Sequence, residues 1–297
     1  MNTSSSNHTG PPAAPTVASE IETWLLLEAV YLRYGYDFRQ YARTSIDRRL
    51  DLFCRLEGIA TRSILQSLLL CDPACMERLL ATLTVETTSM FRDPEFYVAL
   101  RHTVLPLLRG LPLLRIWHAG CSSGEEVYSL AILLREERFD GALRVYATDI
   151  SATALERAKN GIYGLGAMRE NSDRYVRAGG TCTFADYYVA DYGSAIMDAS
   201  LKKNITWAHH NLVTDRSFNE FHLILCRNVL IYFNPPLQNR VHTLFYESLA
   251  PGGVLALGDK ETVAFTGYEA RYQTLDPRAK LYRKPVEVRH TSIAEEG

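Results

Sequence analysis

Two acidic residues directly after a glycine mark the part of the sequence that could bind a ligand. An apolar run over residues 114–119 ends in GCSSG at residues 120–124, Glu125 and Glu126 follow, and a helical pattern begins there. A strand, a glycine-cornered turn and a helix start in this order typically build a nucleotide-type site at the carboxyl edge of a parallel sheet. A second apolar run over residues 143–148 ends in Asp149, at about the distance where an acidic residue meets ribose hydroxyls in such folds.

The same corner lacks the groups that bind phosphates. A phosphate-binding loop would carry Gly-Lys-Ser or Gly-Lys-Thr where this chain has Gly124-Glu125-Glu126. Two carboxylates at a helix N-terminus would repel a pyrophosphate, which argues against ATP and NAD. They suit an adenosine ligand with a cationic or zwitterionic second half, and S-adenosylmethionine has that character. The alternative is that both glutamates only complement the helix dipole.

Composition places the chain among ordinary globular proteins. It has 297 residues and a net charge of −2, which provides no global attraction to nucleic acid or anionic lipid. No apolar run approaches the roughly 20 residues that span a bilayer, and the N-terminus lacks a secretory pattern, so we expect a cytoplasmic protein. The cysteines lack paired C-x-x-C spacings and no histidine cluster completes a zinc set, so we expect reduced thiols and no metal site.

Shifts in composition predict the domain boundaries. Residues 1–19 are rich in Ser, Thr, Pro and Ala and bury too little apolar surface to fold, so we expect a flexible tail, with a second tail at residues 287–297. Residues 20–84 show a helical pattern with breaks at Gly35, Gly58 and Asp72-Pro73, which predicts a small all-helical domain. Residues 85–286 form the main domain.

Strand and helix patterns alternate in the main domain, which predicts βαβ units and a parallel sheet. The expected strands are residues 114–119, 144–148, 205–209, 221–225 and 254–257, and the expected helices are residues 127–136, 152–159 and 236–249. Between about residues 161 and 203 the alternation stops, and glycines and aromatic runs indicate short inserted antiparallel strands. The predicted fold is therefore a Rossmann-like α/β domain with a small β subdomain, preceded by an all-helical domain.

One helix of the N-terminal domain offers arginines to a partner. Over residues 45–57 an apolar stripe recurs at helical spacing, and Arg48 and Arg55 share the opposite face. Arg43 and Arg49 lie near them, so the segment could dock an acidic partner. Neighbouring aspartates dilute the charge, and a simply solvated helix face is the alternative.

Four sequence blocks in order resemble one family, the chemotaxis-receptor methyltransferases of the CheR type. They are TVETTSMFRD at residues 84–93, GCSSGEEVYS at 120–129, ATDI at 147–150 and CRNVLIYF at 226–233, and the likeness covers nearly the whole chain. The resemblance implies a protein-glutamate O-methyltransferase that uses S-adenosylmethionine, yields S-adenosylhomocysteine and esterifies glutamates on the cytoplasmic helices of chemoreceptors. We expect it to act as a monomer.

The resemblance also assigns roles to residues of this chain. Thr88 and Arg92 correspond to the pair at the methionine end of the cofactor, because arginine suits its carboxylate. Tyr232 and Arg227 resemble residues near the reacting centre, and Arg109 is a candidate for the family's catalytic arginine. The cofactor residues that the resemblance implies are Glu86, Thr88, Ser89, Arg92, Gly120, Glu125, Glu126, Asp149, Asn211, Leu212, Cys226 and Arg227. It places the docking arginines at Arg43, Arg48, Arg49 and Arg55.

One departure from the family pattern keeps a second function open. The family usually has asparagine where this chain has Glu86, whose carboxylate could repel the cofactor carboxylate or compete with it for Arg92. The alternative function is a binding module of a chemosensory system that keeps the cofactor or receptor contact without turnover.

A second motif is typical of another class of methyltransferase, but this chain matches it only in part. Asn234-Pro235-Pro236-Leu237 is similar to the Asn-Pro-Pro-aromatic motif of nucleic-acid amino methyltransferases, yet its last residue is not aromatic. We interpret the two prolines as the start of a helix and expect no nucleic-acid substrate.

Overall fold

The computed structural model describes residues 17–84, 88–139 and 142–286, which form two compact units. Unit 1 contains the chain up to Arg39 together with Arg43–Leu83, and unit 2 contains Gln40–Ala42 and the chain from Thr84 onward. Both expected tails fall almost wholly outside the described residues. The first helix already begins at Ala18, just inside the expected N-terminal tail.

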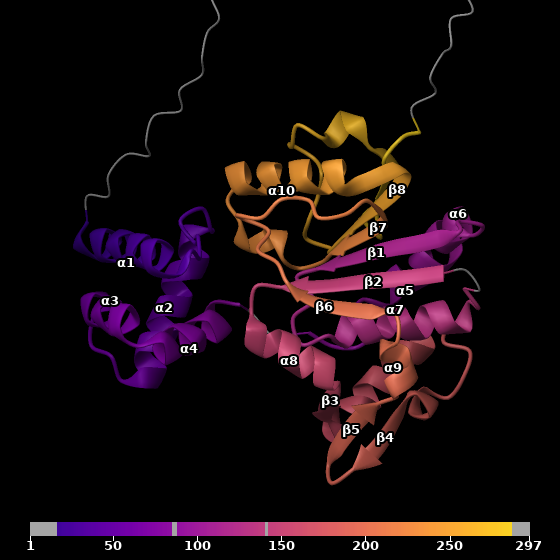
Figure 1. Ribbon diagram of the computed structural model, residues 1–297, viewed down its shortest axis with the longest axis horizontal. Helices are drawn as coiled ribbons and strands as arrows, with labels where there is room; N and C mark the ends of the chain where they lie inside the picture. Colours follow the sequence, from indigo (N-terminus) through magenta and orange to yellow (C-terminus); the bar gives the residue numbers. More distant parts are fainter. Residues whose placement is uncertain (1–16, 85–87, 140–141, 287–297) are drawn as a thin grey trace, which may run out of the picture. The chain divides into compact units, whose positions relative to one another are not determined.

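Within the described residues, unit 1 consists of helices, as the sequence predicts (Figure 1). Gly35 ends the first helix in the left-handed conformation, with φ of 77°, and the Thr61 side chain caps the third by accepting from the Ile64 N–H at 3.2 Å. Buried side chains such as Leu26 and Phe53 form its core. The helices are α1 (Ala18–Tyr34), α2 (Arg43–Glu57), α3 (Arg62–Cys71) and α4 (Pro73–Leu83).

The main sheet of unit 2 has the strand order β6-β2-β1-β7-β8-β10-β9, and Figure 1 shows the first five of these strands side by side. The pairs β6–β2, β2–β1, β1–β7 and β7–β8 are parallel, whereas β10 is antiparallel to both of its neighbours. The strands are β1 (Leu113–Ala119), β2 (Ala142–Asp149), β6 (Ile205–His209), β7 (Phe221–Cys226), β8 (Leu249–Leu257), β9 (Gln273–Asp276) and β10 (Leu281–Arg283). The last two were not predicted as strands.

Helices cover both faces of this sheet, because its central strands are apolar on both sides. In β1, Ile116 packs into one buried cluster with Leu130 of α7, and its neighbour Trp117 packs into the other with Phe245 of α10. The helices of unit 2 are α5 (Pro94–Ala99), α6 (Leu105–Leu108), α7 (Glu125–Glu136), α8 (Ala152–Asn160), α9 (Met168–Arg177) and α10 (Pro235–Ser248), with a π-helical turn at Leu100–Val104. The side chain of Asn234 caps α10, which confirms the interpretation of the two prolines as a helix start.

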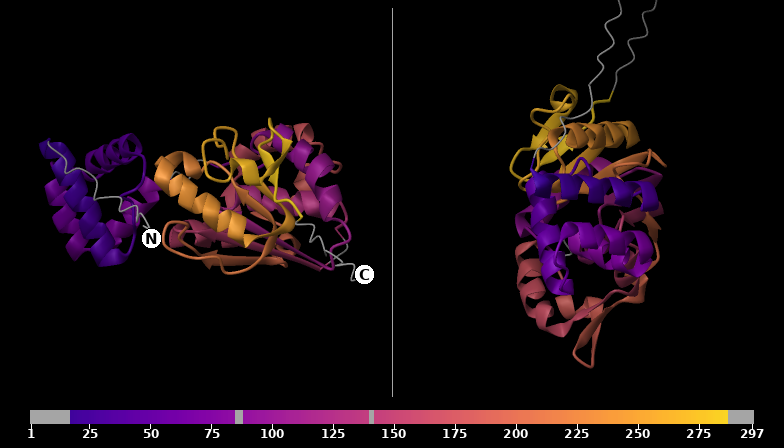
Figure 2. Two further views of the ribbon diagram at one scale, coloured as in Figure 1. Left: turned by 90° about the horizontal axis from the view of Figure 1, so that it is seen from above. Right: turned by 90° about the vertical axis from the view of Figure 1, so that its left-hand side faces the viewer.

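A small antiparallel sheet is inserted between α8 and β6. Its order is β3 (Ile162–Gly164), β5 (Ser194–Met197) and β4 (Tyr188–Asp191), and it projects from unit 2 on the side away from α10 (Figures 1 and 2). The predicted inserted strands are confirmed. Helix α9 of the same insertion was not predicted, because its sequence RENSDRYVR after Met168 is mostly polar and few of its residues are buried.

Candidate active site

The carboxyl ends of four parallel strands meet at one edge of the main sheet. Ala119 of β1 pairs with Thr148 of β2, and Asp149 pairs with His209 of β6. On the other side of β1, His118 pairs with Leu225 of β7. The loops after these four strands therefore share one edge, where open α/β sheets bind ligands.

The turn after β1 is built on glycines that no other residue could replace without strain. Gly120 has φ of 73°, and a Cβ atom there would lie 2.5 Å from Cγ2 of Val229, in the loop after β7. Gly124 has φ of 92°, and its Cβ would lie 2.8 Å from the Cβ of Ala158 in α8. The expected residue Gly120 thus lets the loop after β7 pack directly onto the corner.

Asp149 is held at the end of β2 by backbone groups. One carboxylate oxygen accepts the N–H of Ser122 at 2.8 Å, and the other accepts the N–H of Ser151 at 2.9 Å. Burial raises the pKa of Asp149, while the backbone N–H groups act in the opposite direction. Each oxygen has room for a second donor, so the fixed carboxylate suits a pair of hydroxyl groups such as a ribose diol.

The two glutamates at the start of α7 differ in their surroundings. Glu125 is partly exposed and accepts a hydrogen bond from the Ser123 hydroxyl at 2.8 Å. Glu126 is buried and forms an ion pair with Arg227. Sequence reasoning favoured Glu126 as the acidic partner of the ligand, but its carboxylate is already paired within the chain, so Glu125 is the better placed of the two.

Arg227, after β7, lies at the centre of a buried ion cluster. Its guanidinium group pairs with Glu126 and, at 2.6 Å, with Asp93, and it stacks 4.0 Å from the ring centroid of Phe96. His118 lies 3.8 Å from Glu126, but burial lowers the pKa of this histidine and keeps it neutral. The cluster joins the segment before α5 to the loop after β7.

These contacts correct the expected role of Arg227. A side chain that is 1% exposed and paired with two carboxylates cannot also present its guanidinium group to an incoming carboxylate without breaking a buried pair. We therefore interpret Arg227 as a residue that positions the site, and the expectation that it contacts the substrate is withdrawn.

The contacts of two further arginines argue against their predicted roles. Arg109 follows α6 and pairs with Glu137 at 2.8 Å, at the opposite end of α7 from Glu125, which argues against its assignment as the catalytic arginine. Arg49 is buried and donates to the carbonyl oxygens of Thr82 and Leu83 at 3.0 and 2.8 Å. Its guanidinium group stabilises the end of α4 rather than a partner.

The other arginines predicted to dock a partner lie on the surface of α2. Arg43 is exposed and pairs with Asp47 at 2.9 Å, which neutralises part of its charge. Arg48 and Arg55 are exposed, and no ion pair involves them within the described part of the chain. Leu52 and Leu56, 41% and 72% exposed, lie between and beside them on the helix.

Further predicted site residues belong to the segment before α5 and to the loop after β7. Thr88, Ser89 and Arg92 precede α5 and are half-buried, and the Arg92 carbonyl accepts from Arg227 at 3.4 Å. Tyr232 is half-buried, and its carbonyl accepts from the N–H of Ala42 at 2.7 Å. Glu86 lies outside the described residues.

Residues after β6 and at the end of β7 complete the edge. Asn211 is buried, and its side-chain oxygen accepts the N–H of Val213 at 3.0 Å. Leu212 and Cys226 are also buried. Both belong to the apolar cluster that contains Trp117 and Phe245.

Sequence reasoning missed polar atoms that the fold buries at this edge. The Ser122 hydroxyl and the Asn228 carboxamide oxygen are buried with no hydrogen-bond partner among the described residues. Buried polar atoms are normally satisfied, so these two are open to a partner that the described residues do not supply. The sequence signal was available, because both residues lie within blocks already noted, but their burial was not predictable.

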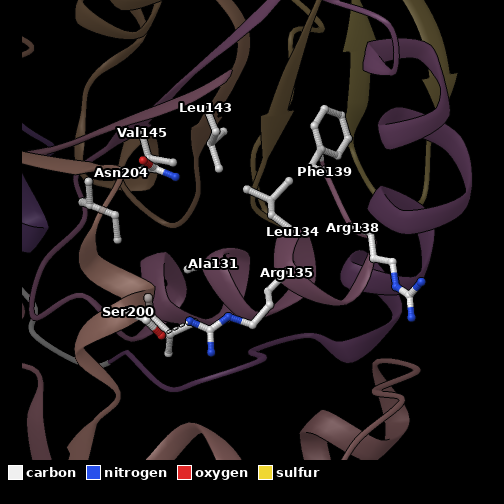
Figure 3. Close-up of a pocket in the computed structure, with 11 residues that line it drawn as sticks. Ala131, Leu134, Arg135, Arg138, Phe139, Leu143, Val145, Ser200 and Asn204 are labelled. Atoms are coloured by element: carbon white, nitrogen blue, oxygen red, sulfur yellow. Dashed lines mark hydrogen bonds between the residues drawn. The ribbon is translucent and has the colours of Figure 1, made fainter. Parts of the chain in front are cut away.

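A separate pocket of about 340 Å³ lies at the other end of the strands (Figure 3). It is formed by the C-terminal part of α7 and the first residues of β2 and β6, and Arg135 reaches across it to the Ser200 hydroxyl. Since Glu125 lies at the N-terminus of α7, this pocket is not part of the candidate active site.

Three further features were sought in the described residues: a membrane-spanning helix, a metal site and disulfide bonds. No helix in residues 17–84, 88–139 and 142–286 has the length and apolar character of a membrane span. Histidine, cysteine and carboxylate side chains of these residues form no group of three that could hold a metal ion. The six cysteines are unpaired thiols.

A turn with acidic residues after β1, a buried aspartate after β2 and a Rossmann-like sheet are typical of a protein that binds a nucleoside-type ligand. Comparison with protein families identifies it further. Residues 86–278 match the model described as "CheR methyltransferase, SAM binding domain", and residues 24–84 match the "CheR methyltransferase, all-alpha domain". The chain belongs to the CheR methyltransferase family.

Individual relatives agree with this assignment. The chain is similar to "Putative methyltransferase Cher3" of Pseudomonas putida, with 50% identity over 266 residues, covering 90% of this chain and 97% of that protein. It is also similar to the "Chemotaxis protein methyltransferase" of Listeria monocytogenes, with 33% identity over 238 residues, covering 77% of this chain and 85% of that protein.

The comparisons confirm several predictions made from the sequence. The fold is a helical domain followed by an α/β S-adenosylmethionine-binding methyltransferase domain with a small antiparallel sheet. The protein is a CheR-type methyltransferase, and S-adenosylmethionine is its cofactor.

Proposed function

We propose that this protein is a protein-glutamate O-methyltransferase that esterifies glutamate side chains of chemoreceptors. The main support is its membership of the CheR family, together with a relative that is named as a chemotaxis protein methyltransferase. The polar edge of the sheet supports the cofactor part of the proposal. The exposed arginines of α2 support the receptor part.

The residues at the sheet edge fit the cofactor. Asp149 would hold the ribose hydroxyls, Asn211 and Leu212 would lie beside the adenine, and Glu125 would face the cationic half. Thr88 and Arg92 would hold the methionine carboxylate and amino group. When bound, S-adenosylmethionine supplies an electrophilic methyl group, which a glutamate carboxylate accepts as a methyl ester.

The chain has little acid or base work to do in this reaction. A glutamate with an ordinary pKa of about 4.3 is already ionised at neutral pH and needs no general base. The protein therefore contributes by orienting the carboxylate and by excluding water, and alignment of reacting groups can lower a barrier by several kcal/mol. Tyr232, in the loop after β7, is the residue we assign to orient the incoming carboxylate.

Docking of the receptor would use the exposed face of α2. Arg48 and Arg55 are seven residues apart and lie on one side of the helix with Leu52 and Leu56. Cationic and apolar side chains on one helix face complement an amphipathic helix with acidic residues. Arg49 takes no part, because it is buried.

The proposal is tested with purified protein and receptor cytoplasmic fragments. Titration calorimetry should detect S-adenosylhomocysteine binding, and radiolabelled methyl groups should appear on receptor glutamates as an alkali-labile product. An Arg48→Glu/Arg55→Glu variant should raise the KM for receptor about tenfold without changing cofactor affinity. Arg33→Glu, an exposed change on α1, is the matched control. Cofactor binding with label that resists alkali would refute glutamate esterification.

A non-catalytic binding module is the second candidate, and Glu86 is the observation that favours it. A carboxylate at this position could compete with the cofactor carboxylate for Arg92 and weaken binding. Under this alternative the protein binds S-adenosylmethionine or receptor but transfers no methyl group. A Glu86→Asn variant that gains both affinity and turnover would favour the module for the natural sequence, whereas unchanged behaviour would remove the reason for it.

A further inference from the structure

Glu261 lies in the loop after β8, and its carboxylate accepts hydrogen bonds from four backbone N–H groups. One oxygen accepts from Val229 at 2.8 Å and from Leu230 at 2.7 Å. The other accepts from Asn228 at 3.0 Å and from Gly258 at 2.7 Å. The residue is only 4% exposed. An ionised carboxylate has about four lone-pair positions, so this set of donors satisfies it.

The Glu261 carboxylate occupies an anion-binding site that these four backbone N–H groups form. Burial raises the pKa of Glu261, and the four N–H groups lower it by stabilising the ionised form. Hydrogen bonds to an ionised acceptor are about twice as strong as neutral ones. Three of the four donors belong to consecutive residues after β7, so the contact fixes the shape of that loop rather than a single point on it.

The loop that Glu261 holds has an unusual backbone. Asn228 has φ of 61°, the left-handed region that few residues other than glycine adopt. A Cβ at Gly258 would lie 2.8 Å from both the Asn228 nitrogen and the nearer Glu261 oxygen, so only glycine permits the approach. Tyr232 follows within the same loop, and Val229 of this loop packs on the corner at Gly120.

Two other left-handed residues near the sheet edge are held in the same way, by a hydrogen bond from the backbone N–H to a buried side chain. Non-glycine residues in the left-handed region store backbone strain that surrounding contacts must support. Three such residues near the sheet edge each donate the backbone N–H to the side chain of a buried residue. The pairs are Phe91 with Ser129 at 2.8 Å, Ser122 with Asp149 at 2.8 Å, and Asn228 with Glu261 at 3.0 Å.

We propose that Glu261 is a positioning residue for methyl transfer. It acts through the loop after β7, whose fixed backbone places Tyr232 and the wall formed by Cys226 beside the reacting groups. The inference rests on the proposed function, because it assigns Glu261 a part in turnover and not only in folding. Loss of the carboxylate should therefore change kcat more than it changes cofactor affinity.

The decisive variant is Glu261→Gln, which keeps the shape but leaves an amide N–H₂ facing backbone N–H donors. At a temperature where the variant is fully folded, kcat for receptor methylation should fall about 100-fold, as for a displacement of reacting groups by about 1 Å. The affinity for S-adenosylhomocysteine should change less than fivefold. Glu261→Asp, which keeps the charge on a shorter side chain, should recover part of kcat. Glu247→Gln, an exposed change on α10, is the matched control.

A purely structural role would lower the melting temperature of Glu261→Gln but leave kcat of the folded protein within twofold of wild type, and that result would overturn the inference. If neither variant folds, amide hydrogen exchange of the wild-type protein decides. The amides of Asn228, Val229 and Leu230 should exchange as slowly as those of β7, and unprotected exchange would refute the contact. Wild-type protein that makes no methyl ester would instead refute the proposed function.

Discussion

Replacing Arg227 by methionine would remove the centre of the buried ion cluster. The Arg227 side chain is 1% exposed and its partner Glu126 is 9% exposed, whereas Asp93 is 46% exposed. After the change, Glu126 would have no cationic partner there, because the ring of His118, 3.8 Å away, is neutral. Leaving one partner of a buried pair without the other costs about 3–5 kcal/mol, and the contact with Asp93 adds less because water reaches its carboxylate.

The expected magnitudes differ between the two partners. Arg227→Met should destabilise unit 2 by about 3–4 kcal/mol, because the remaining charge of Glu126 is buried. Glu126→Gln should cost about 1–3 kcal/mol, because Arg227 would still have Asp93 and the ring of Phe96. The double variant has no buried charge left from this pair. Its loss of unfolding free energy should therefore be about 2 kcal/mol smaller than the sum of the losses in the two single variants.

Urea unfolding of the four proteins measures this coupling; tryptophan fluorescence follows it in a Trp24→Phe background, in which the remaining tryptophans, Trp117 and Trp207, both lie in unit 2. Arg177→Met is the control, because Arg177 makes an ion pair with Glu95 in which both side chains are more than half exposed, and it should change stability by less than 1 kcal/mol. If the effects of Arg227→Met and Glu126→Gln add within about 0.5 kcal/mol, the pair is not coupled and its assignment as a buried positioning contact is wrong.

Three further outcomes are expected. Asp149→Asn should weaken S-adenosylhomocysteine binding about 10- to 100-fold in calorimetry, because one charge-assisted acceptor is lost, whereas the exposed Asp186→Asn should not. Burial lowers the pKa of His242 from 6.5 to about 4. The free energy of unfolding should therefore be independent of this histidine above pH 6.5 and should fall by up to about 3 kcal/mol as the pH drops toward 4, because unfolding then takes up a proton. His242→Leu should flatten that part of the curve of unfolding free energy against pH, measured by urea titration. Gly120→Ala should lower thermal stability and cofactor affinity together, because its φ of 73° and the contact with the loop after β7 both exclude a Cβ; wild-type values of both would contradict the close packing.

Local patterns were sufficient to predict the strands and the corner of the site. The apolar run before Gly120 and the run before Asp149 have strand length and end at turn signals, so their positions in a parallel sheet follow from neighbouring residues. Asp149 was predictable because it follows the end of its strand directly. The glycines of the corner were predictable for the same local reason.

Contacts between distant residues were not predictable. Arg227 and Glu126 are 101 positions apart, and nothing in either block indicates that their charges cancel in the interior. Arg49 lies on a helix whose spacing suggested a shared arginine surface, but its hydrogen-bond acceptors are 33 and 34 residues further along the chain. Glu261 is a single carboxylate after a strand, and only the folded loop after β7 supplies its four donors.

The charges at the sheet edge bear on the kind of ligand that can bind there. The positive charge of Arg227 is engaged by Glu126 and Asp93, so it is not available to offset the other carboxylates of this edge. Asp149 and Glu125 are carboxylates outside that cluster, and Asp149 is held by two backbone N–H groups. On the proposed function, these two carboxylates would attract the sulfonium charge of the methyl donor, whereas Arg92 would meet its carboxylate.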